Sequence, residues 1–137
     1  DMVTDAAGSG YAEASSIWAN SPVNSSYILA RGSVGRIAYV QVNSGSDGFR
    51  AYDGAYISDV NGTPSFYNAP QSLATTWGNA LTTYYNGTVG FPVAYSGTMG
   101  TGDLSIGSVS GAQHFDGTIR EVKIFDSELT AAEVGDL

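Results

Sequence analysis

The sequence predicts an all-β fold, an antiparallel β-sandwich, that ends in one short helical turn. Short apolar runs recur at a spacing of roughly 8–12 residues, and clusters of Gly, Asn, Asp and Ser separate them, as is typical of sandwiches and barrels. No convincing helical period occurs before Thr130. The 137 residues contain no internal repeat. A chain of this length predicts one domain, residues 1–137, with a core of its own.

The first segment, residues 1–24, is the hardest to interpret and suits a strand followed by a linker. Residues 12–18 fit a strand or a helical turn, and we interpret them as a strand. Pro22 then predicts a loop over residues 20–25. The glycines of residues 8–10 are interpreted as a turn, because neither Gly-Lys-Ser/Thr nor a helix follows them as in a phosphate-binding loop.

The middle of the chain carries the clearest strand signals, each bounded by turn-forming residues. The predicted strands are Tyr27–Ala30, Ile37–Val42, Phe49–Tyr52 and Ala55–Val60. Further along, Asn86-Gly87 predicts a type I′ hairpin, because Asn and Gly tolerate positive φ at both central positions.

The last strand is predicted to begin after the turn dipeptide Asp116-Gly117. Strict alternation would place Ile119 and Val122 on opposite faces, so we expect a bulge near Arg120-Glu121.

A short helical turn is predicted to follow that strand. Thr130 and Glu133 have the spacing of a capping box, in which each side chain binds the backbone N–H of the other residue. Leu129 and Val134 are placed to form a hydrophobic staple across the cap.

Three blocks of sequence resemble laminin-G-like domains, which are jelly rolls of the concanavalin-A-like lectin/glucanase type. They are the closing strand and turn just described, the hairpin at 72–88 with its Trp and Tyr-Asn-Gly strand ends, and the short Leu-Ser-Ile-Gly strand at 104–107. The resemblance implies a jelly-roll β-sandwich. It does not fix a function, because this fold hosts lectins, adhesion modules, glycanases and structural domains.

The chain departs from this family at its beginning. Related jelly rolls open with strands that include the partner of the last strand, and such strands are hard to find before Ser26. They are either degenerate within Tyr11–Trp18, absent in a compact variant, or supplied by a neighbouring chain. The third option would leave a sheet edge exposed, which natural proteins avoid, and we favour the first.

Composition excludes several classes of partner. With 13 acidic residues against 5 basic ones, the net charge is -8, and such a field repels nucleic acids and anionic lipid surfaces. There is no cysteine, so disulfides and thiolate metal sites are excluded. No apolar run approaches the ~20 residues of a membrane span. Because the chain begins with Asp1, we expect a piece of a larger extracellular or virion-surface protein.

Hydrolytic chemistry finds little support in the pattern of acidic residues and histidine. A glycosidase needs two carboxylates flanking one bond. The four glutamates are scattered, without the alternation that would aim two of them into one cleft: Glu13, Glu121, Glu128 and Glu133. His114 is the only histidine, and no Gly-x-Ser-x-Gly elbow occurs. We expect His114 to be a loop residue and the protein not to be an enzyme.

No cofactor is required by any motif, although the resemblance implies Ca²⁺ as an optional ion. Hard oxygen ligands are plentiful in and beside the predicted turns. Four aspartates are placed there, without the spacing that would name a site: Asp47, Asp53, Asp59 and Asp103. The metal site is therefore left unassigned.

Aromatic residues give the best positive indication of function, because they make up 12% of the chain and nine are Tyr. Buried Tyr needs a hydrogen-bond partner, so an excess of Tyr favours half-wet surfaces where rings can stack on sugars. The predicted ligand-binding residues are Arg50, Tyr52, Asp53, Tyr56, Tyr67 and Asn68. The alternative is that these aromatics belong to the core or to cross-strand pairs.

The sequence therefore predicts a non-catalytic carbohydrate-recognition or adhesion module of a larger protein, such as a phage tail fibre or spike. Its partners would be a glycan or cell-surface polysaccharide and the subunits of the parent protein, with homo-oligomers formed through that assembly. A structural decoration or subunit-contact domain is the second hypothesis, and a glycoside hydrolase is the third.

Overall fold

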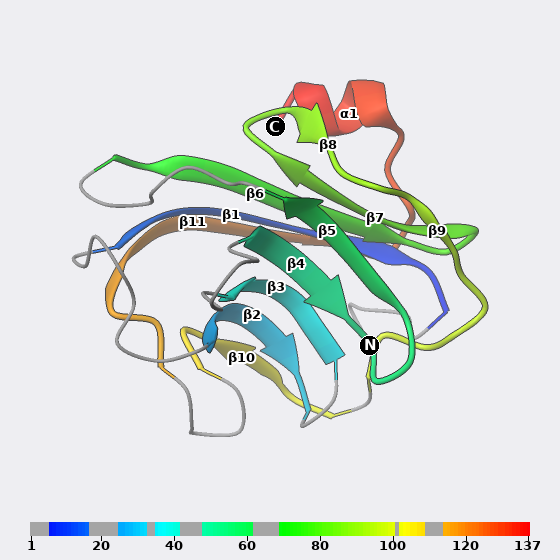
Figure 1. The fold of residues 1–137 in the computed structure, drawn as a ribbon, viewed down its shortest axis with the longest axis horizontal. Helices are drawn as coiled ribbons and strands as arrows, with labels where there is room; N and C mark the ends of the chain where they lie inside the picture. The colour runs from blue at the N-terminus through cyan, green and yellow to red at the C-terminus, as the bar shows by residue number, and fades with distance from the viewer. Residues whose placement is uncertain are drawn as a thin grey trace.

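The structure is a computed structural model that describes residues 6–16, 25–32, 35–41, 48–61, 69–100, 102–108 and 114–137. Two antiparallel sheets pack face to face, and a short helix lies outside one of them (Figure 1). This is the β-sandwich that the sequence predicts.

The first sheet, sheet A, holds both the first and the last strand of the sandwich. Its strand order is β11 (Gly117–Phe125), β1 (Gly8–Ser16), β6 (Gln71–Trp77), β7 (Ala80–Tyr85) and β8 (Thr88–Val89). The two-residue strand β9 (Val93–Ala94) also pairs with β7. Asn86 and Gly87 form the turn between β7 and β8 with φ values of 47° and 77°, which confirms the predicted hairpin.

The second sheet, sheet B, contains the predicted central strands. Its order is β10 (Leu104–Ile106), β2 (Ser25–Arg31), β3 (Gly35–Gln41), β4 (Gly48–Tyr52) and β5 (Ile57–Asn61). The strand predicted from Ala55 begins only at Ile57, because an Asp53 carboxylate oxygen accepts the N–H groups of Ala55 and Tyr56 and holds them in a turn.

The opening strand that the sequence hides is β1, which lies between β11 and β6 and pairs with both. Of the three explanations, the first is therefore confirmed. The turn expected at residues 8–10 is wrong, because β1 begins at Gly8. Glycine is needed there for packing. A Cβ on Gly8 would lie 2.4 Å from the Trp77 ring, and one on Gly10 would lie 2.5 Å from Ile37 Cγ2.

The predicted bulge in β11 is confirmed at Arg120. Glu13 of β1 pairs with Glu121, but Ala14 pairs with Ile119, so Arg120 is the extra residue. The bulge allows Ile119 and Val122 to pack against the same core, which strict alternation would forbid.

The core lies between the two sheets and is contributed by alternate residues of their strands. Ala12 and Ala14 of β1 face it, as do Leu73 of β6 and Phe49 and Ala51 of β4, all fully buried. Its largest fully buried apolar side chains are Trp77, Phe49, Ile28, Leu29, Ile37, Leu73, Leu81 and Met99.

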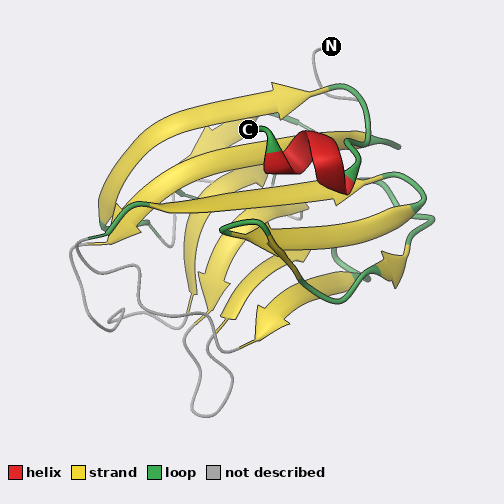
Figure 2. Ribbon diagram, turned by 90° about the horizontal axis from the view of Figure 1, so that it is seen from above, coloured by secondary structure: helices red, strands yellow, loops and turns green. Residues whose placement is uncertain are grey.

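Helix α1 (Ala131–Gly135) covers the outer face of sheet A, as Figure 2 shows from above. The predicted capping box is present: the Glu133 N–H donates to Thr130 Oγ1 at 3.3 Å, and the Thr130 N–H donates to Glu133 Oε2 at 2.7 Å. Val134 packs with Tyr11 and Tyr84, and Leu129 joins the same cluster, as expected of a staple. No helix in the described ranges is long and apolar enough to cross a membrane.

Candidate functional site

The predicted binding residues on β4 alternate with core residues. Phe49 and Ala51 are fully buried between the sheets, so this part of the aromatic run is core. Arg50 and Tyr52 lie on the opposite, outer face of sheet B, where side chains at i and i+2 point the same way. The structure therefore brings two of the six predicted residues together on one face.

Both of these side chains already have partners within the chain. Arg50 Nε lies 3.7 Å from Asp59 Oδ2 on β5, and the Arg50 side chain is only 13% exposed. The Tyr52 hydroxyl donates to the Gly54 carbonyl at 2.7 Å, and its ring packs against Tyr27 and Ala30. Little of Arg50 is thus presented to an external ligand.

Asp53 and Tyr56 belong to the β4–β5 turn and bind the segment that follows β9. The Tyr56 hydroxyl is 2.9 Å from Ser96 Oγ, and the Tyr56 ring meets the edge of Tyr95 at a centroid distance of 5.3 Å and an angle of 76°. Burial raises the pKa of Tyr95 well above its ordinary value, and the Asp53 carboxylate raises it further. Tyr56 thus fastens the turn to the side of the sandwich.

The remaining two predicted residues, Tyr67 and Asn68, lie outside the described residues. The predicted site as a whole stays a prediction, divided between the outer face of sheet B and the β4–β5 turn.

Each glutamate has a structural partner within the chain. Glu13 Oε1 accepts from Arg120 at 2.8 Å, and Glu121 lies 3.3 Å from Lys123. Glu128 accepts the N–H groups of Asn79 and Ala80 at 2.8 and 3.2 Å, while Glu133 completes the helix cap. His114 is an exposed residue in the loop before Phe115, as expected.

The described acidic residues do not gather into one cluster, and the optional Ca²⁺ stays a prediction. No group of three or more His, Cys, Asp or Glu side chains in this part of the chain could hold a metal ion. Asp53 is engaged in its turn and Asp59 lies beside Arg50, whereas Asp47 lies outside the described residues.

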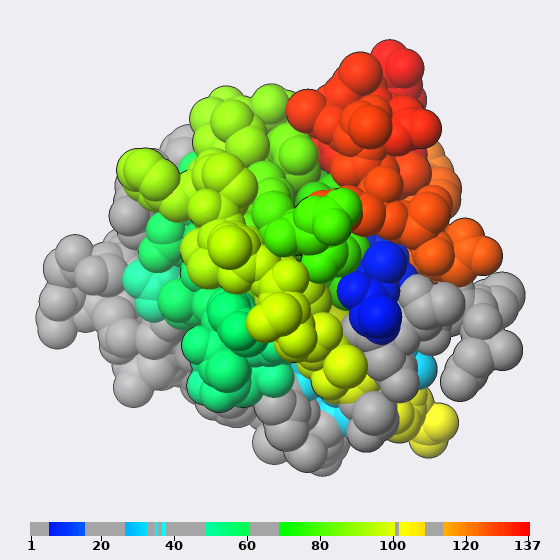
Figure 3. Space-filling model, turned by 90° about the vertical axis from the view of Figure 1, so that its right-hand side faces the viewer, coloured from blue at the N-terminus to red at the C-terminus, as the bar shows by residue number. Residues whose placement is uncertain are grey.

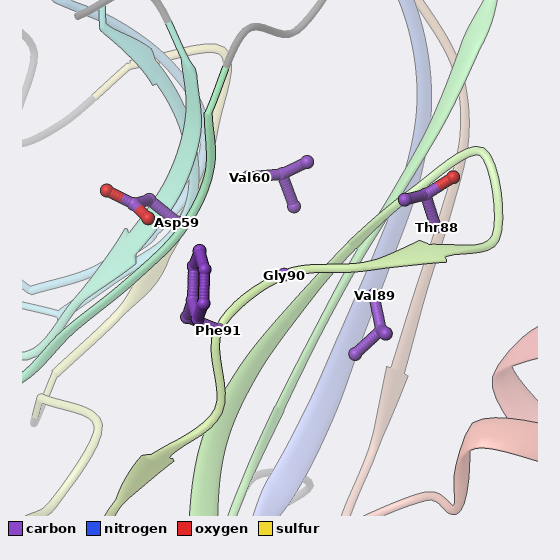
Figure 4. A pocket seen from close by; sticks show the side chains of 6 residues that line it. All are labelled: Asp59, Val60, Thr88, Val89, Gly90 and Phe91. Carbon is purple, nitrogen blue, oxygen red and sulfur yellow. The ribbon is translucent and has the colours of Figure 1, made fainter.

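A groove that the sequence did not reveal lies at the edge of the sandwich between β5 and the β7–β8 hairpin. Its volume is about 280 Å³, and we call it the edge groove; its lining residues are Asp59, Val60, Thr88, Val89, Gly90 and Phe91. In Figure 4, the Asp59 carboxylate and the Phe91 ring lie close together on one side, and Thr88 lies on the other. The side view in Figure 3 shows the segment after β8 (yellow-green) running across this flank of the molecule.

The backbone of Gly90 and Phe91 ties the two sheets together at this edge. The Gly90 N–H donates to the Thr83 carbonyl of sheet A at 2.8 Å, and the Phe91 N–H donates to the Asp59 carbonyl of sheet B at 3.2 Å. The buried Ser58 hydroxyl donates to the Phe91 carbonyl at 2.9 Å. A Cβ on Gly90 would lie 2.3 Å from the Asp59 carbonyl, so only glycine allows this approach.

Phe91 is the most exposed large apolar residue among those described, at 72%. Sequence reasoning missed it because the residues that line the groove are about thirty positions apart and form no motif. The available signal was Phe91 itself, an aromatic between Gly90 and Pro92, directly after a hairpin.

The fold and the comparisons define the class of protein. Two antiparallel sheets packed face to face, with first and last strands adjacent, form a jelly-roll sandwich. A laminin-G-like family model, described as the concanavalin A-like lectin/glucanases superfamily, matches residues 6–135. The chain belongs to this superfamily. A search of curated proteins finds no match.

Solved structures share the fold at low sequence identity. Domain 4 of AbnA, an extracellular arabinanase from Geobacillus stearothermophilus, in complex with arabinotriose, is 16% identical with a TM-score of 0.69, over 98% of this chain and 68% of that chain. A Bacteroides ovatus protein proposed to bind carbohydrate is 14% identical with a TM-score of 0.77, over 97% and 41%. The carbohydrate-binding module of a Ruminococcus gnavus IT-sialidase, bound to α2,3-sialyllactose, is 14% identical with a TM-score of 0.69, over 98% and 83%.

Proposed function

We propose that this chain is a non-catalytic carbohydrate-binding module of a larger extracellular or virion-surface protein. The observation that carries the proposal is the edge of the sandwich, where the exposed Phe91 and the acidic residue Asp59 both line an open groove. Rings and carboxylates are the groups with which proteins hold sugars, since rings cover apolar C–H faces and carboxylates accept hydroxyl hydrogen bonds. Similar structures contain arabinotriose and sialyllactose, which supports the same class of ligand.

The contacts of the glutamates favour binding over hydrolysis. A glycosidase would need one carboxyl group as acid and a second as base or nucleophile on either side of the scissile bond. Here Glu128 holds the β6–β7 turn, Glu133 caps α1, and Glu13 pairs with Arg120. Glutamates with structural duties of this kind are poor candidates for catalysis.

The test is binding of the purified chain to a glycan array, with Ca²⁺ and again with a chelator. We expect saturable binding to a family of related glycans, and the comparison of the two conditions tests whether a bound Ca²⁺ takes part. Incubation of the bound glycans, followed by product analysis, should reveal no cleavage. A folded protein that binds no glycan would overturn the proposal.

One observation favours the second hypothesis, a subunit-contact domain. β10 is an edge strand of sheet B, and its Leu104 and Ile106 are 39% and 55% exposed. Exposed apolar residues on a sheet edge are typical of contact surfaces. Sedimentation velocity over a range of concentrations tests this, because a contact domain should form oligomers that Ile106→Lys abolishes.

A further inference from the structure

We propose that the edge groove is the sugar-binding site and that it takes one uncharged sugar residue of a glycan, stacked on Phe91 with a hydroxyl donating to Asp59. This inference rests on the proposed function, and it places the site away from most of the residues that the sequence predicts. Four observations carry it: the size of the groove, the way Phe91 is held, the position of Asp59 and the distribution of positive charge.

The size of the groove suits a single sugar ring. Pockets that enclose drug-sized ligands measure roughly 300–1,000 Å³. At about 280 Å³, with one side open, the edge groove is large enough for one pyranose or furanose ring but not for a buried oligosaccharide. The rest of a glycan would extend into solvent.

Phe91 is exposed on a backbone that is fixed from both sides. Its N–H donates to the backbone carbonyl of Asp59, and its carbonyl accepts from the Ser58 hydroxyl. The same hydroxyl accepts the Thr83 N–H at 3.1 Å. Exposing 72% of an apolar ring to water is unfavourable on its own. Because the backbone holds this ring in place, little conformational entropy is lost when a ligand stacks on it.

The hydrogen bond from the Phe91 N–H to the Asp59 backbone carbonyl also places Asp59 beside Phe91. Asp59 lies on the outer face of β5, and its carboxylate is held by Arg50 at 3.7 Å while its side chain remains 25% exposed. A carboxylate in this position can accept hydroxyl hydrogen bonds, which are stronger when the acceptor is charged. Arg50 thus acts as a positioning residue for the carboxylate.

None of the basic side chains that the structure describes lines the edge groove. The chain has five basic residues against 13 acidic ones. Arg120 and Lys123 pair with Glu13 and Glu121 on sheet A, and Arg31 is buried with its Nε donating to the Gly102 carbonyl. Arg50 lies beside Asp59 but is not among the residues that line the groove, and the side chain of Arg36 lies outside what the structure describes.

An acidic sugar would therefore meet Asp59 in the groove and a net charge of -8 overall, without a cation from the lining residues. A neutral sugar would meet no such repulsion. The groove accordingly selects uncharged glycans over sialylated, sulfated or uronic ones.

The experiment compares matched neutral and acidic glycans, including lactose with α2,3-sialyllactose and arabinotriose with uronic-acid trisaccharides, on an array and by titration calorimetry at low and high salt. The variants are Phe91→Ala and Asp59→Asn. Ile106→Ala is the matched control, since it removes another exposed apolar side chain on β10, at the far edge of sheet B. Tyr52→Ala tests the outer face, and amide NMR spectra establish that each variant is folded.

We expect neutral glycans to bind, and Phe91→Ala to lower their affinity about tenfold or more. Ile106→Ala and Tyr52→Ala should leave that affinity unchanged. Asp59→Asn should weaken the binding of neutral glycans by less than Phe91→Ala does. It should also narrow the difference in affinity between the neutral and acidic members of each pair. Neutral binding that survives Phe91→Ala but not Tyr52→Ala would overturn the groove while keeping the proposed function. Acidic glycans that bind more tightly and depend on Phe91 would overturn the selectivity, and a blank with every glycan would overturn the proposed function itself.

Discussion

At the scale of single residues, the buried hydroxyl of Tyr95 is the clearest unsatisfied group. The side chain is 6% exposed, and within the described residues its hydroxyl makes no hydrogen bond of ordinary geometry, although the Asp53 carboxylate lies near enough to raise its pKa. A buried polar group without a partner lowers stability by about 1–3 kcal/mol. Tyr95 is retained with its ring against Tyr56, which fastens the β4–β5 turn.

We expect Tyr95→Phe to leave the protein as stable at neutral pH, or to stabilise it by up to about 1 kcal/mol, because the hydroxyl makes no hydrogen bond of ordinary geometry that the substitution would remove. The matched control is Tyr85→Phe, which should destabilise by about 1 kcal/mol, since the Tyr85 hydroxyl donates to Gln71 at 3.0 Å. Urea unfolding of both variants measures the difference. A larger loss for Tyr95→Phe than for Tyr85→Phe would contradict this assignment.

The raised pKa values of Tyr95, Tyr85 and Tyr11 predict a loss of stability in alkali. All three are raised chiefly by burial, so the folded state keeps its phenol protons at a pH where the unfolded chain releases them. This contribution is fully present below the ordinary tyrosine pKa of 10.0 and is lost as pH rises beyond it. The free energy of unfolding should fall between pH 8 and 11, and it should fall less for Tyr95→Phe than for the unchanged protein. An equal fall in both proteins would contradict the contribution of Tyr95.

Glu128 is a second residue whose task is structural. It accepts two backbone N–H groups of the β6–β7 turn from a position about fifty residues later in the chain. We expect Glu128→Ala to lower the unfolding free energy by about 1–2 kcal/mol and Glu128→Gln, which keeps one acceptor oxygen, to lower it less. Chemical denaturation tests this, and an ordering with Gln worse than Ala would argue against the contact.

At the scale of elements, β1 shows where sequence patterns mislead. Gly8 and Gly10 suggest a turn, yet they lie in a strand. Glycine occurs there because Trp77 and Ile37 occupy the space that a larger side chain would need. The strand signal of β1 is carried by Ala and Ser, which have weak β propensity. Its pairing with β6 and β11 overrides that propensity, and such pairing is not visible in a local window.

We expect Gly10→Val to destabilise the protein by about 1–3 kcal/mol through overpacking against Ile37. Gly135→Ala is the control, since no atom lies within 4 Å of a Cβ there and the residue is helical. Thermal unfolding should separate the two variants clearly. A neutral Gly10→Val would mean that the sheets can move apart at β1.

The closing helix, in contrast, could be predicted from sequence because its signals are local. Thr130 and Glu133 cap it, and Leu129 and Val134 fasten it to sheet A. We expect Thr130→Ala to cost about 1 kcal/mol of stability. The bonds from Thr130 lower the pKa of Glu133, so its contribution is present above the ordinary glutamate pKa and is lost as pH falls through the lowered value. The Thr130→Ala deficit should therefore shrink in acid, as measured by denaturation at pH 7 and pH 3.

At the scale of the whole molecule, the fold was predictable and the edge groove was not. Strand runs, the bulge at Arg120 and the hairpin at Asn86-Gly87 are each visible in short stretches. The groove depends on how far apart two sheet edges lie, and on Gly90 fitting against the Asp59 carbonyl. Likewise, no local pattern indicates that Arg50 is largely buried and bound to Asp59.

The adjacency of β1 and β11 also decides when the molecule can be completed during synthesis. Ser9 pairs with Phe125, so β1 cannot pair on this side until β11, at the other end of the domain, has left the ribosome. Until then, one side of β1 offers unpaired backbone groups, which are a template for association with other chains. Nascent chains released before β11 should aggregate in a cell-free translation assay, whereas chains extended through Phe125 and α1 should remain dispersed.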